Sequence, residues 1–320
     1  MEFILPEEVK EVPVEENKRY DLLIIGAGPA GMTAAVYAAR KKLDTLIISG
    51  NVGGQTLLAP GVETYMGYQF ITGQELMRKF EEQVRQFPIP LLIGDEVTKL
   101  SVGDEFCAVL TSNGKSFEGK TVIIASGRRA RSLNVPGEKE LAGRGVSYCA
   151  TCDAPLFDGM DVAVIGSGNS AITAVNDLTK YARKIHSIVR VAVKADRVLV
   201  EKAEQSGKVE FLSGYTVKEI RGEGKVESIV IRDIKGDKEL ALNVGGVFIE
   251  IGAVPNVEFA KDAVKRNELK EIEVDCDCKT SVAGVFAAGD VTNAPEKQII
   301  VAAGEGAKAA LSAYRYLIET

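Results

Sequence analysis

Two glycine-rich turns constrain the fold of this chain more than any other feature of its sequence. The first occupies residues 26–31 and follows the apolar run 20–25; the second occupies residues 166–171 and follows the apolar run 161–165. Stretches with helical spacing come after both turns. Because glycine lacks a β-carbon, such a turn lets the backbone bend tightly and approach a phosphate closely. Each turn therefore predicts a strand–turn–helix unit that binds a dinucleotide at the N-terminus of its helix.

The distance between the turns indicates two domains. They stand about 140 residues apart in a chain of 320, which is longer than one hydrophobic core usually supports. We therefore predict an α/β protein with two Rossmann-like, three-layer domains. No further glycine turn follows residue 254, so the C-terminal segment is expected to return and complete the first domain. The predicted boundaries are an acidic arm over 1–19, a discontinuous first domain over 20–128 and 254–320, and an inserted second domain over 129–253.

Shorter apolar runs fill in this plan. We expect a second buried strand over 45–48, and strands over 96–110 and 116–125 joined at the hairpin signal Asn113-Gly114. Later in the chain we expect buried strands over 246–251 and 284–288, and a long helix over 298–318 that tolerates Gly304 and Gly306.

Composition and charge exclude several classes of function. The net charge of −6 gives no electrostatic support to a nucleic-acid or anionic-membrane partner. No apolar run approaches the ~20 residues that span a bilayer. A single histidine, His186, argues against a Ser-His-Asp triad and against a His-rich metal site. The first nineteen residues do not resemble a secretory signal, so we expect a cytoplasmic protein with no membrane partner; the acids of this arm are Glu7, Glu8, Glu11, Glu15 and Glu16.

Cys149 and Cys152 form a Cys-x-x-Cys pair just upstream of the second turn. Such a pair forms a disulfide readily, and its setting lowers the pKa of a thiolate. Five cysteines with one close pair suit a redox dithiol in a reducing compartment better than a disulfide scaffold. The alternative is half of a zinc site completed by Cys276 and Cys278, although a Cys-x-Cys half is atypical for zinc. Asp153, directly after the pair, is either a proton shuttle for the dithiol or an ordinary turn residue.

The side chains that would hold a ribose are atypical at both turns. The acid expected about 20 residues after the first turn is missing, and Ser49 or the backbone is left to take its place. After the second turn, Arg190 indicates the 2′-phosphate of NADPH, or it is a solvated surface charge. Gly289-Asp290 and Lys297-Gln298 are candidates to hydrogen-bond a sugar-like chain and a ring carbonyl, a modest signal because Gly-Asp is common in turns.

Taken together, these motifs closely resemble the low-molecular-weight thioredoxin reductase family, from about Tyr20 to the C-terminus. The segments that carry the resemblance are 26–31, 53–55 (Gly-Gly-Gln), 125–127 (Ala-Ser-Gly), 147–153 (Ser-Tyr-Cys-Ala-Thr-Cys-Asp), 166–171 and 284–290 (Gly-Val-Phe-Ala-Ala-Gly-Asp). The segment 297–311 looks more like the flavoprotein component of alkyl hydroperoxide reductase. That relative carries an additional N-terminal dithiol domain with no counterpart in this sequence.

The resemblance implies a homodimeric FAD enzyme that takes electrons from NADPH or NADH and reduces a thioredoxin- or glutaredoxin-like protein. It implies that Cys152 faces the flavin, that Cys149 attacks the partner's disulfide, and that Asp153 supplies a proton to the departing thiolate. It places FAD against residues from both parts of the first domain: Gly26, Gly28, Pro29, Ala30, Gly31, Ser49, Gly54, Gln55, Ala125, Gly127, Asp290, Lys297, Gln298 and Ile299. It places the nicotinamide nucleotide against Gly166, Gly168, Asn169, Ser170, Ala171 and Arg190.

Two departures from the family pattern bear on the electron donor. The basic cluster that relatives use for the 2′-phosphate appears here as Val189-Arg190-Val191 with Ala195 at the later position, and the acid of NADH-dependent relatives is absent. Reduced ferredoxin as the donor, or a redox-sensing electron-transfer role, therefore stays open. Ala154 stands where relatives usually have glycine, and its methyl is expected to restrict the approach of a nicotinamide.

The two cofactor sites also predict a movement. The dithiol and the nicotinamide must each reach the same flavin, and one rigid arrangement cannot serve both. We therefore expect the second domain to rotate about hinges near residues 127–131 and 252–254.

Overall fold

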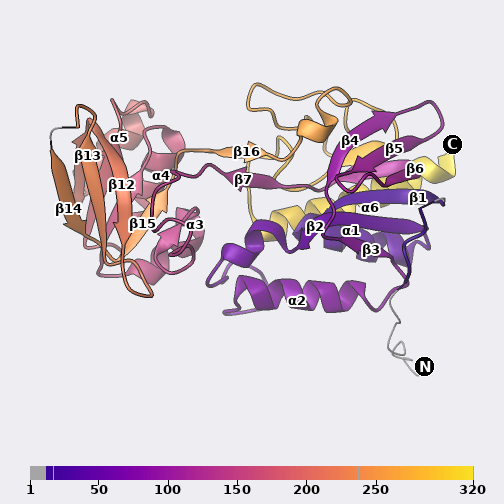
Figure 1. Ribbon diagram of the computed structural model, residues 1–320, viewed down its shortest axis with the longest axis horizontal. Coiled ribbons are helices and arrows are strands. Elements are labelled where there is room, and N and C mark those ends of the chain that lie inside the picture. The colour runs from indigo at the N-terminus through magenta and orange to yellow at the C-terminus, as the bar shows by residue number, and fades with distance from the viewer. Residues whose placement is uncertain (1–11, 17, 237, 320) are drawn as a thin grey trace. The chain divides into compact units, whose positions relative to one another are not determined.

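The computed structural model describes residues 12–16, 18–236 and 238–319, which divide into two compact units (Figure 1). The first unit contains the chain up to Leu57, Thr64–Arg129 and the chain from Val254. The second contains Leu58–Glu63 and Ala130–Ala253. The first unit is therefore discontinuous in sequence, and the bulk of the second is inserted into it.

A seven-stranded sheet forms the centre of the first unit. Its strands run in the order β3-β2-β1-β6-β5-β4, and β17 pairs in parallel with the C-terminal part of β6. β4 and β5 add antiparallel pairs at one edge, whereas the strands around β1 are parallel. The bounds are β1 (Arg19–Ala27), β2 (Thr45–Val52), β3 (Leu91–Ile93), β4 (Val97–Val102), β5 (Cys107–Thr111), β6 (Ser116–Ile124) and β17 (Val285–Ala287).

Alternate residues of β1 belong to two different cores. Leu22 and Ile24 pack with helices on one face of the sheet, and Leu23 and Ile25 pack with β5, β6 and residues 257–264 on the other. A run that is buried from both sides must be apolar throughout, as expected for a central parallel strand. The helical elements of this unit are α1 (Pro29–Arg40), η1 (Gly54–Leu58), α2 (Gly73–Val84), η3 (Glu258–Ala260) and α6 (Ile299–Glu319).

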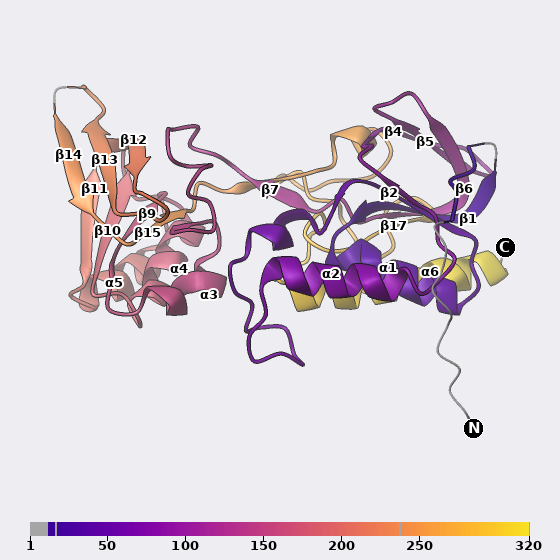
Figure 2. The ribbon, with the colours of Figure 1, turned by 60° about the horizontal axis from the view of Figure 1, so that its bottom comes forward.

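The C-terminal helix α6 crosses α1 at close range, and both figures of the whole chain draw the two helices together (Figures 1 and 2). A β-carbon on Gly306 would lie 2.0 Å from the carbonyl oxygen of Ala30, so only glycine permits this approach. Through β17 and α6 the C-terminal segment returns to the first unit.

A five-stranded parallel sheet in the order β11-β10-β9-β15-β8 forms the centre of the second unit. Helices cover one face, where Val162 and Val164 point, and a three-stranded antiparallel sheet covers the other, where Ala163 and Ile165 point (Figure 2). The bounds are β8 (Val146–Ser147), α3 (Ala150–Asp153), η2 (Ala154–Phe157), β9 (Asp161–Ile165), α4 (Asn169–Leu178), β10 (Lys184–Val189), α5 (Arg197–Gln205), β11 (Val209–Ser213), β12 (Tyr215–Arg221), β13 (Ser228–Asp233), β14 (Glu239–Asn243) and β15 (Gly246–Ile249).

Two of the segments that connect the units pair with each other. They are the short strands β7 (Arg128–Ala130) and β16 (Ala253–Pro255). Gly127 (φ +65°) and Gly252 (φ +93°) stand beside them in a conformation that favours glycine. The predicted hinge segments therefore coincide with a two-stranded ladder flanked by glycines.

The predicted α/β class with two Rossmann-like units, the second inserted into the first, is confirmed. The hairpin at Asn113-Gly114 is also present, because β5 and β6 pair in antiparallel fashion around it. The three-stranded sheet β12–β14 was not predicted. The helix expected after the second turn ends at Leu178, and the strand expected over 45–48 runs on to Val52.

Of the predicted acidic arm, Glu7, Glu8 and Glu11 lie outside the described residues. The part that the structure describes is anchored, because Glu16 forms an ion pair with Lys115 at 2.9 Å and Val14 packs against the core. Among the described helices, none has the length and apolar character needed to cross a membrane.

Candidate functional site

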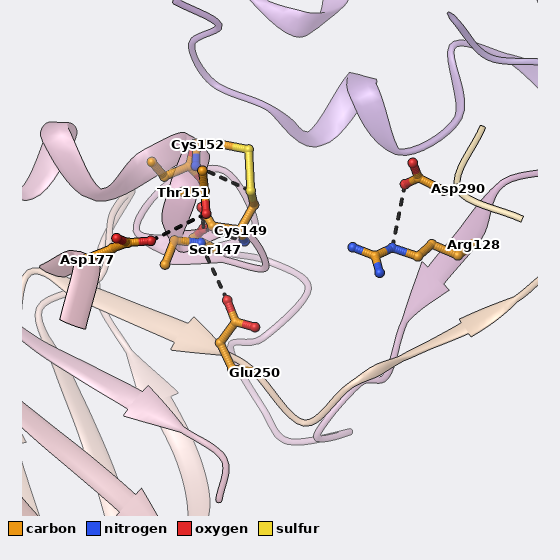
Figure 3. The surroundings of a disulfide bond; sticks show 10 residues. Arg128, Ser147, Cys149, Thr151, Cys152, Asp177, Glu250 and Asp290 are labelled. Atoms are coloured by element: carbon orange, nitrogen blue, oxygen red, sulfur yellow. Dashed lines mark hydrogen bonds and ion pairs between the residues drawn. A yellow bond between two sulfur atoms is a disulfide. The ribbon is translucent and has the colours of Figure 1, made fainter. Parts of the chain in front are cut away.

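The dithiol lies at the start of the short helix α3 (Figure 3). Cys149 and Cys152 are joined by a disulfide, and Cys149 is the residue that caps the helix. The Cys149 sulfur accepts a hydrogen bond from the backbone N–H of Cys152 at 3.3 Å. Hydrogen bonding to a charged form favours that form, so this donor stabilises a thiolate at Cys149 once the disulfide opens.

Asp153, directly after the pair, is a buried acid with only 7% of its surface exposed. Its Oδ2 accepts a hydrogen bond from the Ser147 hydroxyl at 2.6 Å, and the same hydroxyl accepts one from the backbone N–H of Cys149 at 3.1 Å. Burial raises the pKa of the Asp153 carboxyl, and the hydrogen bond from Ser147 opposes that rise. An acid whose pKa is raised keeps its proton longer and is suited to protonating a sulfur.

Ser147 was not among the predicted site residues, although it belongs to the motif that contains the cysteines. Its hydroxyl links the backbone of Cys149 to the carboxylate of Asp153 and so positions the acid relative to the dithiol. The sequence signal was its place at the end of β8, two residues before Cys149.

Two further contacts fix α3 within the second unit. The backbone N–H of Ala150 donates to Glu250 at 3.4 Å, and the Thr151 hydroxyl donates to Asp177 at 3.5 Å (Figure 3). Ala154, after the helix, is 2% exposed and belongs to the core cluster of this unit. Its methyl is therefore packed among core side chains of this unit, and the expectation that it restricts a nicotinamide stays a prediction.

The first glycine turn excludes side chains at two positions and leaves open space at a third. A β-carbon on Gly26 (φ +108°) would lie 2.3 Å from the carbonyl oxygen of Ala125, and one on Gly31 would lie 1.8 Å from that of Gly26. A β-carbon on Gly28 would have no neighbour within 4 Å, and Gly28 caps α1 without a side-chain hydrogen bond. Backbone donors at the start of α1 thus face an open cradle that fits a pyrophosphate, with Pro29 at the first helical position.

Residues from the far end of the chain converge on this turn. A β-carbon on Gly289 (φ +80°) would lie 3.1 Å from that of Ala30, so Gly289-Asp290 stands beside the start of α1. Glu305 of α6 accepts a hydrogen bond from the backbone N–H of Gly289 at 2.7 Å and holds this pair in place. Sequence reasoning missed Glu305, because no motif connects a helical glutamate to a glycine in a distant turn.

Arg128 joins two of the predicted flavin residues. Its guanidinium lies 3.5 Å from the Asp290 carboxylate, and its backbone carbonyl accepts a hydrogen bond from the Gln55 side chain (Figure 3). Burial raises the pKa of the Asp290 carboxyl, and the positive charges of Arg128 and Lys297 oppose that rise. Arg128 was also missed; its signal is a basic residue directly after Ala-Ser-Gly, where β6 has ended.

Ser49, expected to replace the missing ribose acid, makes two hydrogen bonds that brace the turn. Its hydroxyl accepts a hydrogen bond from the backbone N–H of Ala27 at 3.1 Å and donates one to the carbonyl of Asn51 at 2.7 Å. An acid is nevertheless close, because a β-carbon on Gly50 would lie 2.6 Å from a carboxylate oxygen of Glu96. Sequence spacing alone could not find Glu96, which comes from the segment before β4.

The residues expected near the flavin ring from the start of α6 are engaged with the protein. Lys297 forms a largely buried ion pair with Glu271 at 3.0 Å and donates to the carbonyl of Thr292 at 2.5 Å. The Gln298 carbonyl accepts the hydrogen bond that begins α6, whose first residue is Ile299. A β-carbon on Gly54 (φ +56°), the first residue of η1, would have no neighbour within 4 Å. The same holds for Gly127, which precedes β7.

The second glycine turn repeats the geometry of the first. A β-carbon on Gly166 (φ +150°) would lie 2.3 Å from the carbonyl oxygen of Glu250, and Gly168 has open space beside it. Gly168 caps α4 without a side-chain hydrogen bond. Ala171 is fully buried beneath this turn, and Ser170 is exposed. This turn therefore also fits a pyrophosphate at a helix N-terminus.

Side chains around the second turn are mostly exposed. Asn169 exchanges two hydrogen bonds of 2.9 Å with Asp196, which ties the turn to the loop after β10. Arg190, the first residue after β10, is exposed. Its guanidinium is thus accessible to a nucleotide phosphate, and equally to solvent.

The remaining cysteines do not join the dithiol. Cys149 and Cys152 are bonded to each other, whereas Cys107 and Cys278 are buried free thiols and Cys276 is an exposed one. Burial raises the pKa of the Cys278 thiol to about 11. In the described part of the chain, no three His, Cys, Asp or Glu side chains cluster as metal ligands would.

Comparisons with known proteins agree with this geometry. Residues 20–306 match the family described as pyridine nucleotide-disulphide oxidoreductase. Among solved structures, thioredoxin reductase from Streptococcus pyogenes MGAS5005 is 40% identical, with a TM-score of 0.90 over 95% of this chain and all of that one. Thioredoxin reductase from Giardia duodenalis is 33% identical, with a TM-score of 0.88 over 94% of this chain and all of that one.

A curated relative with a different name is also similar. The F component of alkyl hydroperoxide reductase from Staphylococcus aureus strain MSSA476 is 41% identical over 305 residues, which is 95% of this chain. The chain spans 60% of the length of that relative.

Proposed function

The chain belongs to the pyridine nucleotide-disulphide oxidoreductase family, and from this premise we propose that it is an FAD-dependent thioredoxin-disulfide reductase. In this proposal electrons pass from a nicotinamide nucleotide through FAD to the Cys149–Cys152 disulfide, and then to a thioredoxin- or glutaredoxin-like protein. The observation that carries the proposal is the disulfide placed directly before a buried acid, in a unit with its own glycine turn.

Family members bind FAD and a nicotinamide nucleotide, and the residues of this chain fit both groups. Gly26, Gly28 and Gly31 would hold the FAD pyrophosphate, and Asp290 and Gln55 would lie along its ribityl chain and ring. When bound, FAD supplies the two-electron chemistry that couples a nucleotide to a disulfide. Glu305 and Arg128 support this site indirectly, because they fix Gly289 and Asp290 before any cofactor arrives.

The dithiol residues have separate tasks. We assign Cys152 to accept electrons and Cys149 to attack the partner's disulfide, because the backbone N–H of Cys152 stabilises a thiolate on Cys149. Asp153 holds a proton on its carboxyl and gives it to the sulfur that leaves when the ring opens. Ser147 keeps the acid oriented while the proton is transferred.

The second glycine turn supports a nicotinamide nucleotide as the donor. Gly166 and Gly168 would hold its pyrophosphate, and exposed Arg190 favours NADPH over NADH, because a guanidinium suits a 2′-phosphate. The absence of a full basic cluster keeps one alternative in place, in which reduced ferredoxin supplies the electrons or the protein acts as a redox-sensing flavoprotein.

We further propose that the units move about β7 and β16 during turnover. The glycines beside these strands, at 127 and 252, can absorb changes in backbone torsion that other residues resist. Small-angle X-ray scattering of the flavin-loaded protein, oxidised and then reduced with NADPH, tests this. Identical scattering curves in both states would contradict the proposal.

The partner and the cellular setting follow the same reasoning. We propose a homodimer, which light scattering on the purified protein tests directly. We place the protein in the cytoplasm, and the free thiols of Cys107, Cys276 and Cys278 support a reducing compartment.

An anaerobic titration of the FAD-loaded protein tests the whole proposal. NADPH, NADH and reduced ferredoxin are added in separate runs, flavin bleaching is followed by absorbance, and free thiols are counted after each run. We expect fast bleaching with NADPH and the appearance of two additional thiols. Bleaching without new thiols would leave a flavoprotein but overturn the disulfide reductase, and bleaching with ferredoxin alone would favour the alternative donor.

A further inference from the structure

A cavity of about 630 Å³ lies in the second unit, away from its glycine turn. Its lining includes Val146 and Asp161, the first residues of β8 and β9. It also includes Arg183 and Gly245, which directly precede β10 and β15. These four strands are parallel, so the cavity opens at their amino ends. Gly166 follows the carboxyl end of β9, which places the proposed nucleotide site at the opposite edge of the sheet.

The buried acid of the dithiol site forms part of the cavity wall. Asp153 and Ser147 both line it. Ser147 satisfies Oδ2 of Asp153, but Oδ1 has no hydrogen-bond partner among the described residues. That oxygen is itself buried, and leaving it without a partner is costly; the cost falls when a small movement of the cavity wall lets water or another small proton donor reach it.

The rest of the lining suits small ligands without a net charge. Leu156, Phe157 and Met160 give it an apolar wall, and Leu156 and Met160 are also exposed to solvent. In addition to Asp153, the cavity is lined by an ion pair between Asp161 and Arg183 at 2.8 Å. The other charged residues of the lining are Arg144, Lys225 and Glu227. These charges include both signs, so the cavity does not favour a strongly charged ligand.

We propose that this cavity is the proton-exchange site of the dithiol, where water and small carboxylic acids exchange protons with Asp153 from the edge of the sheet opposite the nucleotide turn. The proposal deepens the proposed function and rests on Asp153 acting as the acid of the Cys149–Cys152 pair. The raised pKa of the Asp153 carboxyl is consistent with it, since such a group keeps its proton to higher pH and must be reprotonated after each turnover.

Two electrons break the sulfur–sulfur bond and leave two sulfur anions, of which one takes the proton of Asp153 and the other remains a thiolate. The Asp153 O–H bond breaks and one S–H bond forms, leaving a carboxylate. A hydronium ion or a carboxylic acid in the cavity then returns a proton to that carboxylate and leaves as water or as a carboxylate anion.

The first test measures access and does not depend on enzymatic activity. The oxidised, FAD-loaded protein is treated with a water-soluble carbodiimide and a small amine, and labelling at Asp153 is quantified by peptide mass spectrometry. Leu156→Trp, which narrows the cavity, is expected to lower labelling at Asp153 several-fold. Ile234→Trp, at an exposed position of the same unit outside the cavity, serves as the matched control and should leave labelling unchanged.

The second test uses chemical rescue. Asp153→Ala should slow disulfide reduction and leave a space open to the cavity, so added formate should restore a measurable part of the rate. The double variant Asp153→Ala/Leu156→Trp should show little rescue. Circular dichroism of each variant confirms that the fold is retained.

The outcomes separate this proposal from the proposed function. If wild-type protein reduces disulfides but labelling at Asp153 is absent or equal in both tryptophan variants, the cavity is not the exchange site and the reductase proposal stands. If labelling follows the expected pattern but no disulfide is reduced with any donor, the reductase proposal falls and only an accessible acid remains. Rescue by formate that Leu156→Trp does not diminish would also overturn the cavity route.

Discussion

Gly26 and Gly166 have nearly the same surroundings, but the two turns differ at their third position. On either residue a β-carbon would lie 2.3 Å from a carbonyl oxygen, of Ala125 in the first unit and of Glu250 in the second. The first turn ends in Gly31, where a β-carbon would lie 1.8 Å from Gly26. The second ends in Ala171, which is tolerated. The first helix therefore lies closer to its turn, on the side where α6 packs against it through Gly306.

The side chains around the first turn are also more tightly packed together than those around the second. In the first unit Glu305 holds Gly289, and Arg128 is paired with Asp290, so the site is built from interlocked residues. In the second unit Arg190 is exposed, and the turn is tied to the next loop through Asn169. An interlocked site suits a cofactor that stays bound, and an open one suits a nucleotide that binds and leaves. In the proposed function the same backbone turn would thus serve two purposes, and the residues that pack around it would set which one.

The largest effect is expected from a substitution that stops the chemistry of the second unit and leaves the first unit intact. Cys149→Ser should abolish reduction of a thioredoxin-like protein, because the attacking sulfur is lost, while the first unit keeps its FAD and is still bleached by the donor. Insulin-coupled turnover and flavin absorbance measure the two properties separately. Cys276→Ser, at an exposed free cysteine, is the matched control and should retain full activity.

The residues that end the two turns, Gly31 and Ala171, can each be replaced by the residue type found in the other turn. Gly31→Ala should lower the unfolding free energy by about 1–3 kcal/mol and reduce FAD content, because its methyl meets the carbonyl of Gly26. The converse change, Ala171→Gly, should cost only about 1 kcal/mol, the usual penalty for glycine in a helix. Urea unfolding and bound flavin per chain report both effects. Equal losses in the two variants would break the comparison.

Asp153→Asn should slow disulfide reduction by about 100-fold, because an amide has no proton to give. In the wild type the protonated carboxyl is the active form, so the rate should fall as pH rises through the raised pKa of Asp153, and the variant should lack this step.

Stability gives an independent readout of the same shift. A pKa raised on folding means that the folded protein binds the proton more tightly than the unfolded chain, so wild-type stability falls as pH rises from the ordinary carboxyl value through the raised one. Unfolding at several pH values should therefore show a stability difference in favour of Asp153→Asn that grows over this window and is constant above it. A difference that does not change with pH would contradict the shift.

The smallest effect is expected at the open turn. Arg190→Ala should raise the KM for NADPH about tenfold, equivalent to ~1.4 kcal/mol of lost binding, and leave the KM for NADH unchanged. Steady-state kinetics with both nucleotides measure this. Lys194→Ala, at a lysine in the same loop, tests whether any positive charge there suffices. Equal effects on both nucleotides would assign Arg190 a role in packing or general charge.

The sequence predicted the parts of this molecule that depend on neighbours in the chain. The strand–turn–helix units, the hairpin at Asn113-Gly114 and the disulfide all follow from local residue types and spacing. The sheet β12–β14 was missed because one face of its edge strand is exposed and carries no strong apolar pattern, as the run Glu239–Asn243 shows.

The supporting residues of the sites were missed for a different reason. Arg128, Glu305 and Ser147 act through contacts that the fold creates, with Asp290, Gly289 and Asp153 respectively. Only Ser147 lies within a motif, and the motif does not indicate that its hydroxyl holds Asp153. The burial of Ala154 likewise depends on packing that residue identity alone does not reveal.

The split of the first unit has a consequence for how the protein is made. A ribosome completes residues 130–253 well before it reaches β17 and α6, which belong to the core around Ile24 and Ile123. We expect the disulfide-bearing unit to fold during translation, and the flavin cradle to close only after the last helix has emerged. Newly made chains would then pass through a stage in which the sulfurs are in place but no prosthetic group can yet be captured.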